Sequence, residues 1–315
     1  SQMLTSPRRH LTLVIVPTVA LAIEQALRAQ EVMQQAGQDH GGRYVWHSGQ
    51  STEERNEMKS RLASGEQRAL FCSPEAATGG LLLQLFSLAE RGLLGAVIVD
   101  EAHLIDQWGA EFRPEFQLLA PLVRSLKATS PDGVKVVLLS ATFSQSTLNT
   151  LKALFAGKRQ GSVIEVNGSF LRPEPVWYVS EAASHEDHLA QVENAIARLP
   201  APMILYTTEV EQAKFWYQYL RERGYRRCGL FHGATPMQER EGLIHAWRND
   251  GLDIMVATSA FGVGMDKNNV RSVLHVAVPE NLDRFYQESG RGGRDGKASV
   301  AHIIFHHKQL QVARN

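Results

Sequence analysis

Two adjacent carboxylates, Asp100 and Glu101, follow an apolar, β-branched run at positions 96–99. Such a run predicts a buried parallel strand, and open α/β sheets bind ligands at the carboxyl ends of their strands. At this strand tip Asp100 could hold Mg²⁺, directly or through its water, while Glu101 orients an attacking water, because phosphoryl transfer needs charge neutralisation and in-line positioning. Two solvated acids at the end of a strand are the alternative interpretation.

A cluster of large planar side chains comes directly after the acid pair. It consists of Gln107, Trp108, Phe112 and Arg113. Exposed aromatic groups are costly unless they stack on a partner, and unpaired bases are suitable partners for Trp, Phe and Arg planes. The segment therefore predicts contact with single-stranded nucleic acid beside the acid pair, with ordinary core aromatics as the alternative.

Three more strand tips in the first half of the chain carry polar residues or proline. Apolar runs at 11–16, 69–72 and 134–139 predict short strands, and amphipathic helices are predicted at 115–127 and 144–155, the second with Ser144 as its N-cap. Hydroxyl and backbone N–H groups at such tips can contact phosphates. The residues at these tips are Pro17, Thr18, Ser73, Pro74, Glu75, Ser140 and Thr142.

The second half of the chain has its own strand tips and a pair of arginines. Strands predicted at 203–206, 228–231 and 254–257 alternate with helices at 209–223 and 237–249, which indicates a second parallel sheet. Two arginines three positions apart among glycines suit a group donated into the phosphate site of another domain, with a solvated Gly-Arg turn as the alternative. The candidate residues are His232, Thr258, Gly264, Asp266, Gln287, Arg291 and Arg294.

A shift in composition separates the two halves. Gly157, Gly161, Gly168 and the segment 170–175, which holds two prolines, interrupt any periodic element and predict an inter-domain linker. The polar, glycine-rich stretch 38–52 around Trp46 is predicted to be a surface connection. With 315 residues the chain is long enough for two domains of ordinary size.

Charge and composition limit the possible classes of function. Lys plus Arg and Asp plus Glu both number 33, so a nucleic-acid site must be a local patch rather than a global basic field. The two cysteines lie in apolar runs, as buried thiols do, and are too few for an all-thiolate zinc site. His302, His306 and His307 lack acids or cysteines at ligand spacing. No apolar run approaches the ~18 residues of a membrane span.

Two strings carry a specific resemblance. Residues 100–103 read Asp-Glu-Ala-His, residues 105–115 read Ile-Asp-Gln-Trp-Gly-Ala-Glu-Phe-Arg-Pro-Glu, and residues 287–296 read Gln-Glu-Ser-Gly-Arg-Gly-Gly-Arg-Asp-Gly. With the weaker strand-tip strings in the same order, the chain from about 11 to about 305 resembles the core of the RecQ-type superfamily 2 DNA helicases. The resemblance implies an α/β fold of two tandem RecA-like domains with parallel sheets, residues 1–170 and 171–315, with ATP between them.

The resemblance also implies roles for the candidate residues. Asp100 (the Mg²⁺ ligand), Glu101, His103, Arg291 and Arg294 would be catalytic. The nucleotide would be bound or sensed by Ser140, Thr142, Gly264, Asp266 and Gln287. DNA would contact Pro17, Thr18, Ser73, Pro74, Glu75, Gln107, Trp108, Phe112, Arg113, His232 and Thr258. The family implies ATP and Mg²⁺ as cofactors, single-stranded and partly duplex DNA as partners without a membrane, 3′→5′ translocation, and a cytoplasmic or nucleoid location.

One departure from the family pattern is large. A helicase of this kind needs a phosphate-cradling loop, Gly-x-x-x-x-Gly-Lys-Ser/Thr, before the first strand tip, and no such string occurs in the 315 residues. We therefore expect the chain to be a fragment whose phosphate loop lies upstream in a longer parent. We also expect a gap in the first parallel sheet and no ATP hydrolysis by the fragment alone.

Two alternatives remain beside the DNA helicase motor. The Asp-Glu-Ala-His string also occurs in RNA-directed members of the superfamily, so RNA is a second possible substrate. The missing phosphate loop also allows a non-catalytic, helicase-like module for DNA binding or assembly. The acid pair and both arginines are all present in the chain. Their presence argues against a non-catalytic module, because drift would be expected to remove some of them.

Overall fold

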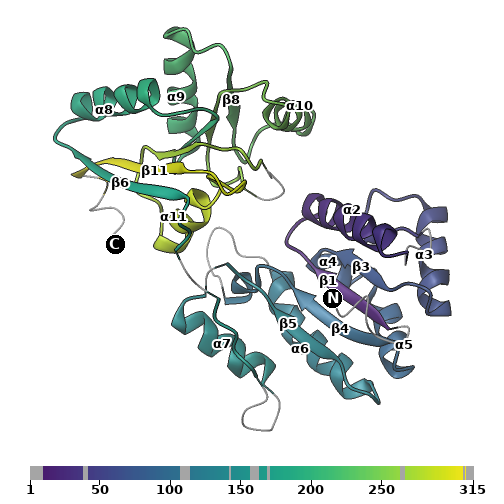
Figure 1. Cartoon of the computed structure of the whole chain (residues 1–315). Helices are drawn as coiled ribbons and strands as arrows, with labels where there is room; N and C mark the ends of the chain where they lie inside the picture. The colour runs from purple at the N-terminus through teal and green to yellow at the C-terminus, as the bar shows by residue number, and fades with distance from the viewer. Residues whose placement is uncertain are drawn as a thin grey trace. The chain divides into compact units, whose positions relative to one another are not determined.

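Each half of the chain is built around one parallel β-sheet (Figure 1). The computed structural model describes residues 10–37, 42–106, 114–141, 143–156, 163–168, 171–262, 267–307 and 309. The chain divides into two compact units, Ser1–Gly168 and Ser169–Asn315. Both sheets are parallel throughout, as the strand and helix alternation of the sequence predicts.

The first unit has a five-stranded sheet with helices on both faces. Its strand order is β2 (Val45–Trp46), β3 (Ala69–Cys72), β1 (Leu11–Ile15), β4 (Leu94–Val99) and β5 (Lys135–Leu138). The helices are α2 (Val19–Gln35), α3 (Thr52–Ser64), α4 (Pro74–Thr78), α5 (Leu82–Glu90), α6 (Pro114–Thr129) and α7 (Gln145–Phe155), with a 3₁₀ turn at Ala102–Asp106. The predicted strands at 11–16 and 134–139 and the helices at 115–127 and 144–155 are confirmed to within two residues.

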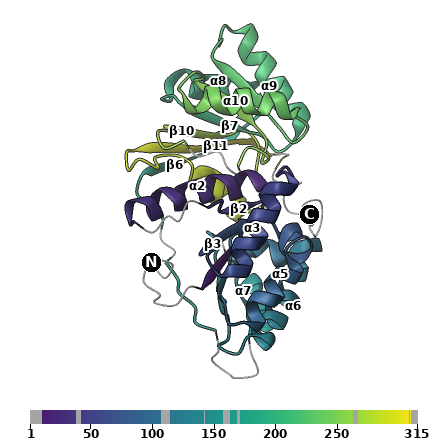
Figure 2. The same ribbon diagram turned by 90° about the vertical axis from the view of Figure 1, so that its right-hand side faces the viewer.

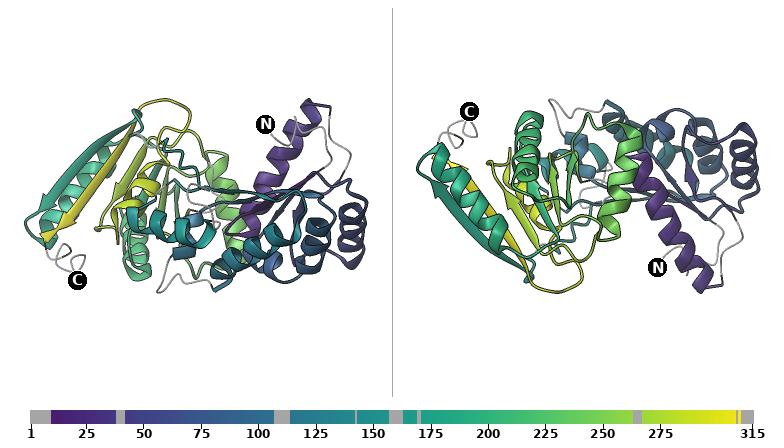
Figure 3. Two further views of the ribbon diagram at one scale, coloured as in Figure 1. Left: turned by 90° about the horizontal axis from the view of Figure 1, so that it is seen from below. Right: turned by 90° about the horizontal axis from the view of Figure 1, so that it is seen from above.

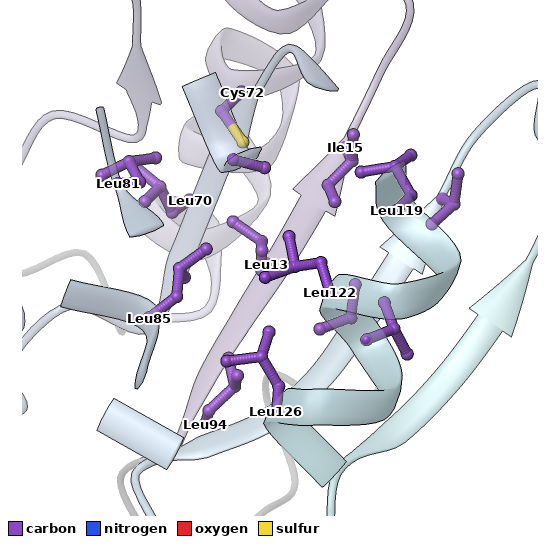
Figure 4. Close-up of a cluster of buried hydrophobic side chains, with 14 of the residues drawn as sticks. Leu13, Ile15, Leu70, Cys72, Leu81, Leu85, Leu94, Leu119, Leu122 and Leu126 are labelled. Carbon is purple, nitrogen blue, oxygen red and sulfur yellow. The ribbon is translucent and has the colours of Figure 1, made fainter. Parts of the chain in front are cut away.

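The two faces of this sheet are covered by different helices. Helix α2 covers one face (Figure 2). Its buried alanines pack there against Val14 and Phe71. Helices α3 to α7 supply the larger core on the other face, around Leu13, Ile15 and Val97 (Figure 4). Because the strands are buried between helices, they read as continuous apolar runs rather than as alternating patterns. Trp46 is buried in β2, so the interpretation of 38–52 as mere surface connection was wrong at this residue.

Strand β5 forms an open side of the first sheet. Its hydrogen-bonded neighbour among the described residues is β4, and Val137 pairs in register with Ile98. Val137 and Leu139 are 39% and 47% exposed, although a parallel sheet normally has both faces covered. The expected gap inside the sheet is therefore absent from the described strands, which are contiguous, and the uncovered region lies at the β5 edge instead.

Leu13 tests how much the central strand contributes to the stability of the first unit. Its side chain is fully buried and lies among Leu85, Leu122 and Leu126 (Figure 4). Leu13→Ala removes apolar atoms and leaves a cavity, so we expect it to lower the free energy of unfolding by about 3 kcal/mol in urea titrations. Leu83→Ala is the control, because Leu83 is 78% exposed and its loss should cost under ~0.5 kcal/mol. Equal effects of the two changes would contradict this packing.

The second unit has a six-stranded sheet. Its strand order is β6 (Pro175–Ala182), β11 (Ser299–His306), β10 (Ser272–His275), β7 (Met203–Tyr206), β9 (Ile254–Ala257) and β8 (Cys228–Phe231). The helices are α8 (His185–Arg198), α9 (Val210–Glu222), α10 (Met237–Arg248) and α11 (Leu282–Ser289). Helices lie on both faces of this sheet (Figure 3). Helices α8 and α9 pack into one core, and Trp247 of α10 packs into a second core.

One expectation about the second unit needs correction. The segment 170–175 was interpreted as part of a linker, but Arg172 and Glu174 contact the second unit and Pro175 begins the edge strand β6. Proline is tolerated at the first residue of an edge strand, so the two prolines do not exclude one here. His302, by contrast, lies within the strand that its apolar neighbours indicate, β11, and hydrogen-bonds to Ser180. The described residues contain no group of three possible metal ligands.

Candidate functional site

Strands β1 and β3 end side by side, and each is followed by a helix N-terminus. Ile15 pairs in register with Cys72, so the two tips lie at the same edge of the sheet. Thr18 caps α2 by accepting a hydrogen bond from the Leu21 N–H at 3.2 Å, and Ser73 caps α4 through the Ala76 N–H at 3.4 Å. The first turn of a helix presents N–H groups that can meet an anion, and α2 begins at this edge of the sheet.

Pro17, Pro74 and Glu75 complete the residues expected at these tips. Pro74 occupies the first turn of α4, where its missing N–H costs nothing. Glu75 is the exposed first-turn acid of the same helix. Its negative charge complements the helix dipole but would repel a phosphate, so Glu75 is the weakest of the expected contacts.

The acid pair lies at the carboxyl end of β4, as the sequence predicts. The Asp100 N–H donates to the Ile15 carbonyl at 2.9 Å, which ties the tip of β4 to the tip of β1. Gln25 of α2 donates from Nε2 to Asp100 Oδ2 at 3.1 Å, and the Glu101 N–H donates to Asp100 Oδ1 at 3.0 Å. Both bonds fix the orientation of the carboxylate.

Glu101 has an unusual backbone conformation. Its φ angle is +50°, in the left-handed region that side chains other than glycine rarely adopt. Such conformations persist where the surroundings determine them, and they cluster at functional sites. The neighbouring Ala102 N–H donates to the Leu139 carbonyl at 2.8 Å, so the strained turn is held between the ends of β4 and β5.

His103 joins the acid pair to the tip of β5. Its Nδ1 lies 2.9 Å from Ser140 Oγ and 3.3 Å from Glu101 Oε2. The predicted residues Asp100, Glu101, His103 and Ser140 are thus brought together in one network. Gln25 belongs to it as well and was not predicted, because α2 is amphipathic and a polar residue on its flank has no distinguishing pattern.

The donor set of this network suits Mg²⁺. Asp100 supplies a fixed carboxylate beside a second carboxylate and a hydroxyl, all at a sheet edge. Mg²⁺ takes oxygen ligands and is typically held by one or two carboxylates together with waters and phosphate oxygens rather than by a protein cage. When bound, the ion would neutralise phosphate charge.

Several expected residues lie outside the part of the chain that the structure describes. They are Gln107, Trp108, Phe112, Arg113, Thr142, Gly264 and Asp266.

In the second unit, His232 and Thr258 follow the neighbouring strands β8 and β9. The Thr258 N–H donates to the Phe231 carbonyl at 3.2 Å, which places both tips at one edge. The His232 N–H donates to Thr235 Oγ1 at 3.0 Å. His232 Nδ1 is buried without a hydrogen-bond partner among the described residues, so the imidazole keeps an unused polar atom at this edge.

The arginine pair follows helix α11, and the two side chains lie in different surroundings. Arg291 is half-buried beside the end of β9, since a Cβ atom added at Gly262 would lie 2.8 Å from its Nη2. The Tyr206 hydroxyl donates to the neighbouring Phe261 carbonyl at 2.8 Å. Arg294 is exposed, three residues further along the turn. Arg291 therefore packs within its own unit, whereas Arg294 reaches solvent.

A buried hydrogen bond between two side chains, which sequence reasoning missed, joins α11 to the sheet. Glu288 Oε2 lies 2.9 Å from Nε2 of His275 at the end of β10, and both side chains are almost fully buried. Glu288 follows Gln287, the remaining expected residue of this helix. A histidine and a glutamate 13 positions apart carry no sequence pattern that would pair them.

Two family models match the chain in succession. The DEAD/DEAH box helicase model matches residues 2–151, and the helicase conserved C-terminal domain model matches residues 187–296. The first match contains the acid network and the second contains the arginine pair. Among the described residues, no helix has both the length and the apolar character that crossing a membrane requires.

The curated relatives include DNA helicases from bacteria. The chain is 30% identical to the ATP-dependent DNA helicase RecQ of Bacillus subtilis over 96% of its own length and 48% of the relative's. It is 30% identical to that of Haemophilus influenzae over 94% and 44%. The chain thus spans about half the length of the curated relatives it matches.

Solved structures share the fold at lower identity. The DUF1998 helicase MrfA bound to DNA aligns with a TM-score of 0.74 and 16% identity, covering 99% of this chain and 45% of that one. Mss116p bound to single-stranded RNA and AMP-PNP aligns with a TM-score of 0.69 and 19% identity, covering 98% and 62%. Both sheets are those of RecA-like helicase cores, and the chain belongs to the RecQ-type superfamily 2 helicases.

Proposed function

We propose that this chain is the motor core of an ATP-dependent DNA helicase that moves 3′→5′ along single-stranded DNA. Residues 1–170 and 171–315 would be its two RecA-like domains, working on single-stranded and partly duplex DNA in the cytoplasm or nucleoid. The observation that carries the proposal is the network at the carboxyl end of β4, where Asp100, Glu101 and His103 meet Ser140. Oriented carboxylates at this edge suit Mg²⁺ and an attacking water.

The residues divide by the ligand that each would meet. Asp100 would hold Mg²⁺ and Glu101 would orient the water, with Arg291 and Arg294 acting on the phosphates from the second unit. Ser140, Thr142, Gly264, Asp266 and Gln287 would contact or sense the nucleotide. The helix caps Thr18 and Ser73 and the planar residues Trp108, Phe112 and Arg113 would contact DNA, with Pro17, Pro74, Gln107, His232 and Thr258 beside them.

A phosphate-binding loop has to be added before the motor can work. The 315 residues contain no Gly-x-x-x-x-Gly-Lys-Ser/Thr string, and the loop is what cradles the triphosphate. The first sheet offers a place for a further strand and helix, because β5 is at an edge and Val137 and Leu139 are exposed on its uncovered face. We call the chain extended upstream by such a βα unit, which carries a Gly-x-x-x-x-Gly-Lys-Ser/Thr loop, the completed protein.

ATP hydrolysis tests this proposal. We expect the 315-residue chain to show no DNA-stimulated ATPase and the completed protein to show it. A matched control carries Lys→Ala in the added loop and should lose activity again, because that lysine contacts the β- and γ-phosphates. Turnover by the unextended chain would contradict the role of the loop. An inactive completed protein that still binds DNA would support the non-catalytic alternative.

The nature of the nucleic acid is tested by binding. Fluorescence anisotropy of the completed protein with AMP-PNP should show tighter binding to a single-stranded DNA oligonucleotide than to the RNA of the same sequence. The affinity should fall with salt, since phosphate contacts release counterions. Tighter binding to RNA would favour the RNA-directed alternative.

A further inference from the structure

We infer that Arg172 is a positioning residue that holds the turn carrying Arg291 and Arg294 in its working shape. The inference rests on the proposed function for the role of those two arginines, and on the contacts of Arg172 for everything else. We use the name arginine turn for residues 290–296, which follow helix α11. Arg172 lies more than a hundred positions earlier in the chain, just before β6.

Arg172 contacts the backbone of the arginine turn through both terminal nitrogens of its guanidinium group. Nη1 donates to the Gly290 carbonyl at 2.7 Å, and Nη2 donates to the Gly293 carbonyl at 2.8 Å. These two carbonyls flank Arg291 on either side. A charged donor makes stronger hydrogen bonds than a neutral one, and the planar fork fixes two acceptors relative to each other.

Glu174 fixes the direction of the Arg172 side chain. Its Oε2 accepts from Arg172 Nε at 3.2 Å, and the two side chains are 20% and 25% exposed. The Glu174 carbonyl also accepts from the Ser299 N–H at 2.8 Å, which ties this segment to β11. Glu174 therefore binds the Nε side of the guanidinium group, while the two Nη atoms face the arginine turn.

Gly293 shows how closely the arginine turn approaches this segment. Its φ angle is +63°, and an added Cβ would lie 2.5 Å from the Lys297 carbonyl oxygen and 2.8 Å from the Glu174 Cβ. Only glycine combines the left-handed conformation with so little space. The Gly293 N–H donates to the Val270 carbonyl at 2.9 Å, so the turn is fixed from two directions.

A second arginine anchors the other end of the turn. Arg271 donates from Nη2 to Asp295 Oδ2 at 2.5 Å and from Nη1 to the Ala298 carbonyl at 3.0 Å. Arg172 contacts the turn only through backbone carbonyls, so it does not compete with the side chains of Arg291 and Arg294 for a ligand. Two anchoring arginines thus fix the backbone from which two functional arginines project.

Hydrogen exchange tests whether Arg172 holds the arginine turn, and it can be measured in the 315-residue chain itself. Arg172→Lys keeps the charge but loses the fork, and Arg172→Ala loses both. We expect the amides of Arg291, Gly292 and Gly293 to exchange at least tenfold faster in both variants. Exchange in β7, at Met203–Tyr206, should stay unchanged.

Arg223→Ala is the matched control for this exchange experiment. It removes an arginine bound to Glu193 at 2.7 Å, in the same unit but away from the turn, and should leave exchange of the arginine turn unchanged. Unchanged exchange of the turn in Arg172→Lys would overturn the inference. Should Arg172→Ala unfold the unit, Arg172→Lys alone decides, because it keeps the packing of the side-chain stem.

A double-mutant cycle in the completed protein tests positioning as distinct from mere stability. Arg172→Lys should lower kcat roughly tenfold or more, because small misplacements of catalytic groups are costly, while KM for ATP changes less than about twofold. In an Arg294→Ala background, the same change should have almost no effect on kcat. An equal loss in both backgrounds would overturn the inference. If the completed protein without any substitution is inactive, the proposed function fails. Hydrogen exchange then decides by itself whether Arg172 holds the arginine turn.

Discussion

Glu101→Gln is expected to lower ATP turnover by the completed protein by about 10²- to 10⁴-fold, the usual contribution of a general base. The amide keeps the size of the side chain but cannot accept a proton from the attacking water. The strained φ of +50° at this position and the His103 contact at 3.3 Å indicate that the surrounding turn holds the carboxylate in place. Steady-state ATPase measured with single-stranded DNA reports the change.

Binding distinguishes a catalytic loss at Glu101 from a structural one. Affinity for AMP-PNP and for single-stranded DNA should change little in Glu101→Gln, since the water is needed only for hydrolysis. Glu90→Gln is the control, because Glu90 is an exposed acid at the end of α5 and should keep full turnover. If Glu101→Gln kept more than about a tenth of the activity, a residue other than Glu101 would have to be the general base.

Arg294→Ala is expected to lower kcat by about 10³-fold or more, the usual contribution of an arginine finger. Arg294 is the better candidate for a reaching group, because it is exposed on the turn whereas Arg291 packs beside Gly262 in its own unit. The loss should fall on kcat, with KM for ATP changing far less, because charge on the γ-phosphate builds up in the transition state.

Lysine and a distant arginine serve as controls for Arg294. Arg294→Lys should recover only part of the activity, because an ammonium group cannot form the bidentate contact of a guanidinium. Arg223→Ala, which removes the exposed partner of Glu193, should leave kcat unchanged. Normal kcat in Arg294→Ala would show that this arginine does not act on the nucleotide.

The parts of the site that follow strand ends could be predicted from the sequence. Asp100 and Ser140 come directly after an apolar run, and Thr18 follows one after a single proline. Parallel strands bring their carboxyl ends to one edge. Ser144 as the N-cap of α7 is confirmed, because capping depends on residues within one turn. Strand ends and helix caps can be predicted because they depend on residues close together in the sequence.

Contacts between distant segments could not be predicted in the same way. Gln25 reaches Asp100 across 75 positions, and Arg172 reaches Gly293 across 121. Both are polar residues of ordinary type, and only the packing of the strands between them decides which partner they meet. Strand β6 was missed for a related reason, since its starting proline resembles a linker until the neighbouring β11 supplies a partner.

The aromatic residues show the limit of composition as a guide. Trp46 lies in a glycine-rich polar stretch, which favours a surface loop, yet it is buried in the two-residue strand β2. A strand this short has no periodicity to detect. Its burial follows from two long-range features: β2 pairs with β3, with Trp46 in register with Cys72, and the indole packs into the large core of the first unit.

A structure of the completed protein bound to AMP-PNP and single-stranded DNA tests the central claim most directly. That claim is that carboxylates of the first unit and guanidinium groups of the second act on one triphosphate. We expect Asp100 and Glu101 beside the γ-phosphate and Arg294 in contact with it from the other unit. A γ-phosphate contacted by the first unit alone, with Arg294 facing solvent, would contradict the account.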